Sequence, residues 1–251
     1  MFNCFEIRNE TATSADLYLY GDIVSDWWGA WAEEDQYPEA VKNFLNGQQG
    51  KSLNIYINSG GGNVFAGIAI YNMIRRFAES ATVKVFVDGL AGSIASVIAF
   101  SGSQPPQIPS NAFLMIHNPW ALVEGNAADL RKMADDLDVI TDGIVNVYME
   151  HVKEGVTEDQ IRELMDAETW MTGTEAAEYF DIETSESVAE IAAAAGEYVA
   201  RSRNMPKNLT VKKDQDPADK TKSENQDARS AVLIQNSKKR DEIARTIINS
   251  L

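Results

Sequence analysis

Short alternating apolar runs and longer helix-like apolar stripes take turns along this chain, and this alternation limits its fold more than any other feature. The alternating runs predict strands over residues 17–20, 53–57, 83–87 and 112–116. Apolar residues three and four positions apart predict helices over 64–78, 91–101, 127–152, 158–165 and 174–179. Strands that alternate with helices are typical of an α/β domain built from crossover units.

The composition changes after residue 200, where aromatic side chains end. Residues 201–251 contain no Phe, Tyr or Trp and carry 12 Lys/Arg against 7 Asp/Glu, whereas residues 1–200 carry 10 against 31. We therefore expect a folded domain over 1–200 and a polar, basic, partly disordered tail over 201–251. Because the acidic body would repel a phosphate backbone, we expect no nucleic-acid partner.

The cysteine content and the hydropathy indicate in which cellular compartment the protein occurs. The single cysteine, Cys4, allows no internal disulfide and no cysteine-based zinc site, which is typical of a reducing compartment. Residues 1–10 lack the basic start and apolar stretch of a secretory signal. The most apolar stretch, residues 90–100, is far shorter than the roughly 20 residues that cross a bilayer. We expect a cytoplasmic chain with no membrane partner.

The first segment suited to catalysis is the glycine run Gly60-Gly61-Gly62, between the predicted strand 53–57 and the predicted helix 64–78. Glycines permit positive φ and leave backbone N–H groups open, as an oxyanion or another anion requires. The run matches neither the phosphate-loop spacing nor the dinucleotide-binding glycine pattern. A tight strand-to-helix turn is the alternative interpretation.

The second and third segments also follow predicted strands. Ser93 begins a small-residue helix, where its hydroxyl and the N–H of Ile94 can face the same point; an N-cap serine is the alternative. His117 ends the predicted strand 112–116 and is either a base or a structural histidine. The other histidine, His151, is expected to cap a solvated helix end.

Together these segments contain the parts that a hydroxyl nucleophile needs. Ser93 would be the nucleophile and His117 the base, with a downstream carboxylate to orient the imidazole. The backbone N–H groups of Gly61, Gly62 and Ile94 are the candidates for an oxyanion hole.

The same segments resemble motifs of the Clp-type (caseinolytic) serine peptidases, in particular their phage and prophage relatives. Residues 57–62 read Ile-Asn-Ser-Gly-Gly-Gly where the family has Ile-Asn-Ser-Pro-Gly-Gly. Residues 89–93 read Gly-Leu-Ala-Gly-Ser, similar to Gly-x-Ala-Ala-Ser, and residues 115–119 read Met-Ile-His-Asn-Pro, which matches Met-Ile-His-x-Pro. The resemblance spans roughly residues 17–188.

The resemblance also indicates the acid of the triad. The family usually has an aspartate two residues before an aromatic, and here Glu168 holds that position before Trp170. Glutamate thus replaces aspartate, and Asp166 is the alternative acid. Two further departures are Phe180, where glycine is usual, and Trp120, close to the position where ring-forming members usually have a glycine pair.

The fold implied by the resemblance is the superhelical stack of ββα units shared by Clp peptidases and crotonases. The helix 127–152 would form a protruding handle, and a flexible C-terminal tail would follow the domain. Members of the family form homo-oligomers, usually heptameric rings or stacked rings, and an ATP-driven (AAA+) unfoldase commonly delivers their polypeptide substrates. Phage-type members are similar to processing enzymes for capsid or scaffold proteins.

The activity expected from the resemblance is that of a serine endopeptidase that needs no cofactor and no metal. One alternative is a catalytically inactive scaffold or assembly subunit of the same fold, because a fold does not guarantee an activity. The other is a crotonase-like acyl-CoA enzyme. Such an enzyme has a similar glycine-supported oxyanion site but would not need Ser93 and His117 together.

Overall fold

A computed structural model describes residues 10–26, 35–185 and 204 of the 251-residue chain. The chain divides into two units, Met1–Val211 and Lys212–Leu251, and every described residue belongs to the first unit. The boundary between a domain over 1–200 and a tail over 201–251 stays a prediction.

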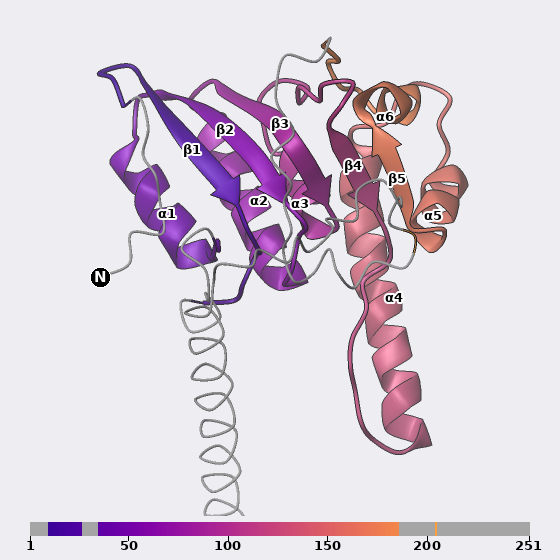
Figure 1. The fold of residues 1–251 in the computed structure, drawn as a ribbon. Helices are drawn as coiled ribbons and strands as arrows, with labels where there is room; N and C mark the ends of the chain where they lie inside the picture. The colour runs from indigo at the N-terminus through magenta and orange to yellow at the C-terminus, as the bar shows by residue number, and fades with distance from the viewer. Residues whose placement is uncertain (1–9, 27–34, 186–203, 205–251) are drawn as a thin grey trace, which may run out of the picture. The chain divides into compact units, whose positions relative to one another are not determined.

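A five-stranded sheet with the order β1-β2-β3-β4-β5 forms the centre of the first unit (Figure 1). Strands β1 to β4 are parallel, and β5 is antiparallel to β4. The strands are β1 (Ser14–Tyr20), β2 (Ser52–Ser59), β3 (Val83–Gly92), β4 (Phe113–Ile116) and β5 (Thr169–Thr172). The predicted mixed α/β fold is confirmed at this level.

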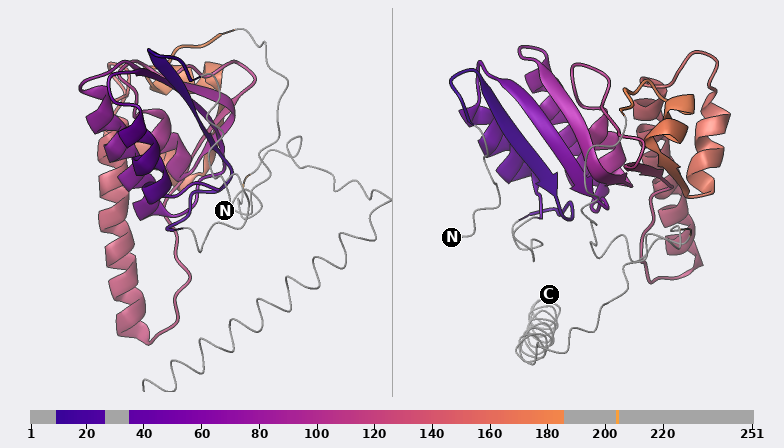
Figure 2. Two further views of the ribbon diagram at one scale, coloured as in Figure 1. Left: turned by 90° about the vertical axis from the view of Figure 1, so that its left-hand side faces the viewer. Right: turned by 45° about the horizontal axis from the view of Figure 1, so that its top comes forward.

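Helices connect the parallel strands, as parallel pairing requires. The helices of the described residues are α1 (Pro38–Gly47), α2 (Val64–Ala78), α3 (Ile94–Ala99), α4 (Ala127–Met149), α5 (Glu158–Asp166) and α6 (Gly173–Tyr179), and the first three of them link the parallel strands. Helices α1, α2 and α3 cover one face of the sheet in Figure 1, and the turned views of Figure 2 show the same layer. The parallel strands and these helices thus form two layers.

The core lies between this helical layer and the sheet. Alternate residues of β1, β2 and β3 are at most 1% exposed; they include Leu17, Leu19, Ile55, Ile57, Val85 and Val87. The intervening positions carry aromatic rings, and the strand register stacks Tyr18 on Tyr56 at 4.8 Å and Tyr56 on Phe86 at 5.1 Å between ring centroids. Cross-strand aromatic pairs of this kind help to hold a register.

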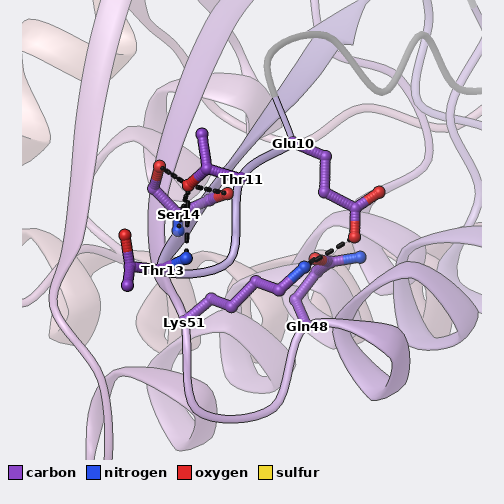
Figure 3. A network of polar contacts seen from close by, with 6 residues as sticks. All are labelled: Glu10, Thr11, Thr13, Ser14, Gln48 and Lys51. Atoms are coloured by element: carbon purple, nitrogen blue, oxygen red, sulfur yellow. Dashed lines mark hydrogen bonds and ion pairs between the residues drawn. The ribbon is translucent and has the colours of Figure 1, made fainter.

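Polar contacts tie the start of β1 to the turn between α1 and β2 (Figure 3). Lys51 Nζ lies 2.6 Å from Glu10 Oε1 and 3.1 Å from Gln48 Oε1. Thr11 Oγ1 accepts a hydrogen bond from the backbone N–H of Ser14 at 2.9 Å. These bonds hold the amino-terminal end of β1, whereas the glycine run follows the carboxyl end of β2.

Two predicted boundaries near the site are wrong, and one strand was not predicted. Strand β3 does not stop at 87 but continues to Gly92, because Leu90, Ala91 and Gly92 pair with residues 113–115 of β4. Helix α3 is consequently shorter than the predicted 91–101. Strand β5 was not predicted, because it has only four residues and most of them are half-buried. Such a short segment shows too little alternation of apolar and polar residues to indicate a strand.

The first half of α4 lies away from this core. Its buried residues, Ile144, Val145 and Tyr148, are all in the second half, whereas Leu130 is 46% and Val139 70% exposed. In Figure 1 this part of α4 extends beyond the sheet together with the segment that precedes it. The buried residues of this helix thus lie only near its C-terminal end.

The described residues meet neither the requirements of a membrane-spanning helix nor those of a metal-binding cluster. None of their helices combines the length and the hydropathy that a bilayer-spanning helix requires. Nor does the described part of the chain bring together three or more His, Cys, Asp or Glu side chains that could hold a metal ion.

Candidate active site

Ser93 occupies the sharp turn between β3 and α3. Its backbone has φ 52° and ψ −128°, a left-handed conformation that a non-glycine residue adopts rarely and at a cost of about 1–3 kcal/mol. Its N–H donates to the Met115 carbonyl at 2.9 Å, which attaches this turn to β4. The turn keeps the Ser93 side chain half-buried at the end of the sheet instead of burying it in the helix.

His117 follows β4 directly, and the strand register brings it to Ser93. Gly92 pairs with Met115, so the residues that follow each of these strands emerge at the same sheet end. The His117 Nε2 lies 2.7 Å from the Ser93 Oγ, which is the separation of a hydrogen bond. A hydroxyl and an imidazole in this contact can act as a nucleophile and its base.

Glu168 stands immediately before β5. It is 9% exposed and has φ 50°, so it forms a second left-handed position beside the site. Strand β5 pairs with β4 in the antiparallel register Ile116↔Thr169. Glu168 directly precedes Thr169 and His117 directly follows Ile116, so both residues flank the same end of this strand pair.

Asp166, the alternative acid, is placed differently. It is exposed at the end of α5, and its Oδ1 accepts a hydrogen bond from Asn118 Nδ2 at 2.6 Å. Of the two candidate acids, Glu168 is therefore the buried one, and Asp166 is bound to Asn118.

The glycine run lies against the Ser93 turn. A Cβ atom added at Gly61 would be 2.7 Å from the Ser93 Cβ and 3.1 Å from the Ile94 nitrogen. The Gly61 N–H already donates to Ser59 Oγ at 3.1 Å, and the Gly61 carbonyl accepts from the Ile23 N–H at 2.8 Å. Among the three predicted oxyanion donors, the bond to Ser59 makes Gly61 less suitable than Gly62 and Ile94.

Two supporting residues escaped the sequence analysis. The buried Tyr148 of α4 shares a hydrogen bond of 2.7 Å with Ser96 Oγ, and Ser96 Oγ in turn donates to the Ser93 carbonyl. Because the Ser96 proton is used toward Ser93, the Tyr148 hydroxyl is the donor. Burial raises the pKa of Tyr148 and keeps this donor protonated. Tyr148 lies beside the predicted apolar stripe of its helix, and no motif signals its hydrogen bond.

Phe180 belongs to the core, and the half-buried His151 packs beside it. The prediction that His151 caps a solvated helix end is wrong, because its ring stacks on Phe100 at 5.0 Å between centroids and its Nε2 is buried. Burial, with a smaller effect of Arg75, lowers the pKa of His151. Phe180, where the motif usually has glycine, is 0% exposed and packs on Phe100 and Tyr148.

A half-buried carboxyl lies just before the Ser93 motif. Burial raises the pKa of Asp88, and the hydrogen bond that Tyr20 donates to its Oδ2 at 2.6 Å opposes this rise. Asp88 is therefore tied to β1 and is not a competing acid for His117.

At one end of this mixed α/β sheet, a serine hydroxyl and an imidazole lie within hydrogen-bond distance, and such a pair is what a serine hydrolase uses to activate its nucleophile. Comparison with known proteins supplies the family. The family described as Clp protease matches residues 39–183, which is more than half of the chain, and the protein belongs to this family.

Individual relatives agree with this assignment. The chain is 33% identical to an ATP-dependent Clp protease proteolytic subunit of Bacteroides fragilis. The 132 aligned residues cover 52% of this chain and 61% of the relative. It is 31% identical over 131 residues to that of Porphyromonas gingivalis, covering 52% and 57%. It is 33% identical over 128 residues to proteolytic subunit 3 of Streptomyces coelicolor, covering 51% and 57%. The chain thus spans about three fifths of the length of the curated relatives it matches.

Proposed function

We propose that this protein is a serine endopeptidase in which Ser93, His117 and Glu168 form the catalytic triad. The observation that carries the proposal is the 2.7 Å contact between Ser93 Oγ and His117 Nε2 at the end of the sheet. Membership of the Clp protease family and relatives named as proteolytic subunits support it.

In the proposed reaction, Ser93 Oγ attacks the carbonyl carbon of the scissile peptide bond while His117 Nε2 accepts the hydroxyl proton. The tetrahedral intermediate collapses to an acyl-enzyme when His117 returns the proton to the leaving amine. Water then attacks the ester carbonyl by the same route in reverse and frees Ser93. Glu168 holds the imidazole through the ring nitrogen that does not face Ser93.

The backbone N–H groups of Gly62 and Ile94 are the proposed oxyanion donors. Gly62 has φ 147°, and a Cβ there would be 2.0 Å from the Ile23 carbonyl oxygen, so the close packing of this backbone against Ile23 requires glycine. One such donor typically contributes about 3 kcal/mol to the stabilisation of the transition state.

Labelling with a fluorophosphonate probe tests the proposal. We expect the probe to modify Ser93, and Ser93→Ala to abolish both labelling and peptide hydrolysis, whereas Ala at the exposed Ser110 leaves both unchanged. Replacement of His117 by Gln should suppress labelling, while the same change at His151 should not. Modification of a different serine, or an unlabelled wild type, would contradict the triad; the second result is the one expected of an inactive scaffold subunit.

We also propose that the protein acts as a homo-oligomer, in a heptameric ring or stacked rings, on polypeptide substrates. The exposed apolar residues of α4 and of the segment before it support this proposal, because large apolar side chains left in solvent are typical of an interface; they are Leu122, Val123, Leu130 and Val139. An AAA+ unfoldase as partner and a role in phage protein processing are further parts of the same proposal.

A further inference from the structure

Asn204 reaches the candidate acid from a part of the chain well beyond the family match. Its backbone N–H donates to Glu168 Oε1 at 2.8 Å, and its side-chain Nδ2 donates to the Ala167 carbonyl at 2.7 Å. The match to the Clp protease family ends at residue 183, so this contact is not part of the matched sequence. Two hydrogen bonds from one residue thus hold two consecutive residues next to the triad.

The position of these bonds matters because of the backbone at Glu168. The residue has φ 50°, a conformation that a glutamate adopts only where its surroundings impose it. Within the described residues, Thr169 pairs with β4 on one side of Glu168, and Asn204 binds the carbonyl of Ala167 on the other. The turn that carries the acid is therefore held from both ends.

The bond to the carboxylate acts on the acid itself. A carboxylate has two oxygens that can accept about four hydrogen bonds. The hydrogen bond from the Asn204 N–H to Oε1 restricts the rotation of this carboxylate. A triad acid works by holding the imidazole in one orientation, so restricting its rotation favours catalysis.

We propose that Asn204 is a positioning residue that orients Glu168 toward His117, an inference that rests on the proposed function. The backbone N–H acts on the carboxylate and the side-chain amide acts on the turn. Neither group touches the substrate, and Asn204 acts only through Glu168.

Two substitutions separate the two bonds. Asn204→Ala keeps the N–H and removes the amide, whereas Asn204→Pro removes both donors. We expect Asn204→Pro to lower kcat for a fluorogenic peptide by about 10- to 100-fold with little change in KM, as small misplacements of catalytic groups do. Asn204→Ala should lower kcat by less than about tenfold, which is the loss that one neutral hydrogen bond accounts for.

A double-mutant comparison distinguishes positioning from a general structural role. In a Glu168→Gln background, Asn204→Pro should cause almost no further loss, because the group through which it acts is already altered. Thermal unfolding of all variants, measured in parallel, shows whether each is folded. An equal loss of kcat in both backgrounds would overturn the inference and indicate a structural effect.

The remaining outcomes are also distinct. If the wild type is labelled at Ser93 and Asn204→Pro has wild-type kcat, the inference fails while the proposed function stands. If Asn204→Pro is more active than the wild type, Asn204 restrains the site and the inference is wrong. If the wild type neither reacts with the probe nor cleaves peptide, the proposed function itself fails.

Discussion

Gly61→Ala offers the sharpest test of how the glycine run supports the Ser93 turn. Gly61 has φ 96°, and a Cβ at this position would be 2.6 Å from the Gly92 carbonyl oxygen and 2.7 Å from the Ser93 Cβ. These neighbours are backbone, or a side-chain atom bonded directly to it, so no flexible side chain can move aside. The added methyl group must therefore displace the glycine loop and the Ser93 turn from each other.

The size of this displacement follows from the contact distances. Ordinary contacts between non-bonded atoms begin at about 3.5 Å, so the two backbones must separate by about 0.8 Å. Forcing alanine into a left-handed backbone costs about 1–2 kcal/mol, and overpacking adds about 1–3 kcal/mol. A shift of about 1 Å at catalytic groups lowers the rate by about 100-fold.

Gly155→Ala is a matched control. Gly155 has φ 91°, close to that of Gly61, but nothing lies within 4 Å of its added Cβ. Both variants should therefore lose about 1–2 kcal/mol of unfolding free energy to backbone strain. Only Gly61→Ala should lose the additional packing energy and the activity.

Urea unfolding and the hydrolysis of a fluorogenic peptide measure these two effects. We expect kcat/KM to fall by about 100-fold in Gly61→Ala and to change by less than about twofold in Gly155→Ala. Equal stabilities of the two variants, together with full activity of Gly61→Ala, would refute the reasoning that the glycine is required by its contact with the Ser93 turn.

Two other predictions concern parts of the molecule outside the site. Burial lowers the pKa of His151 in the folded state, so the folded protein favours the neutral imidazole. The contribution of the neutral imidazole to the free energy of unfolding is complete above about pH 6.5 and is lost as the pH falls toward the lowered pKa. Urea unfolding at pH 7.5 and 5.5 should show a smaller acid destabilisation in His151→Gln than in the wild type, and identical pH dependence would contradict this. Val139→Glu on exposed α4 should leave unfolding free energy within about 0.5 kcal/mol but reduce the oligomer mass in native mass spectrometry; an unchanged mass would exclude this face as an interface.

The sequence predicted the α/β class and the catalytic candidates because both depend on local patterns. Alternating apolar runs marked β1 to β4, and the residues that follow them marked the end of the sheet where Ser93 and His117 meet. The carboxyl ends of parallel strands lie at one edge, so a serine and a histidine after neighbouring strands are brought together by topology alone.

Other features of the site depend on contacts between distant segments. The burial of Glu168 and the hydrogen bond between Asp166 and Asn118 are two such features. The hydrogen bond that the Gly61 N–H donates to Ser59 and the hydrogen bond between Tyr148 and Ser96 are two more. No spacing along the chain predicts these hydrogen bonds, because each partner is chosen by where the strands and helices pack.

The sequence by itself determined which residues can do chemistry here: a serine and a histidine at strand ends beside glycines that leave the backbone open. Only the tertiary structure decided which of the two candidate acids is buried and that Asn204 binds Glu168. The physical reason is that residue type and periodicity are local properties, whereas the orientation of a buried carboxylate is determined by the strand register and the hydrogen bonds around it.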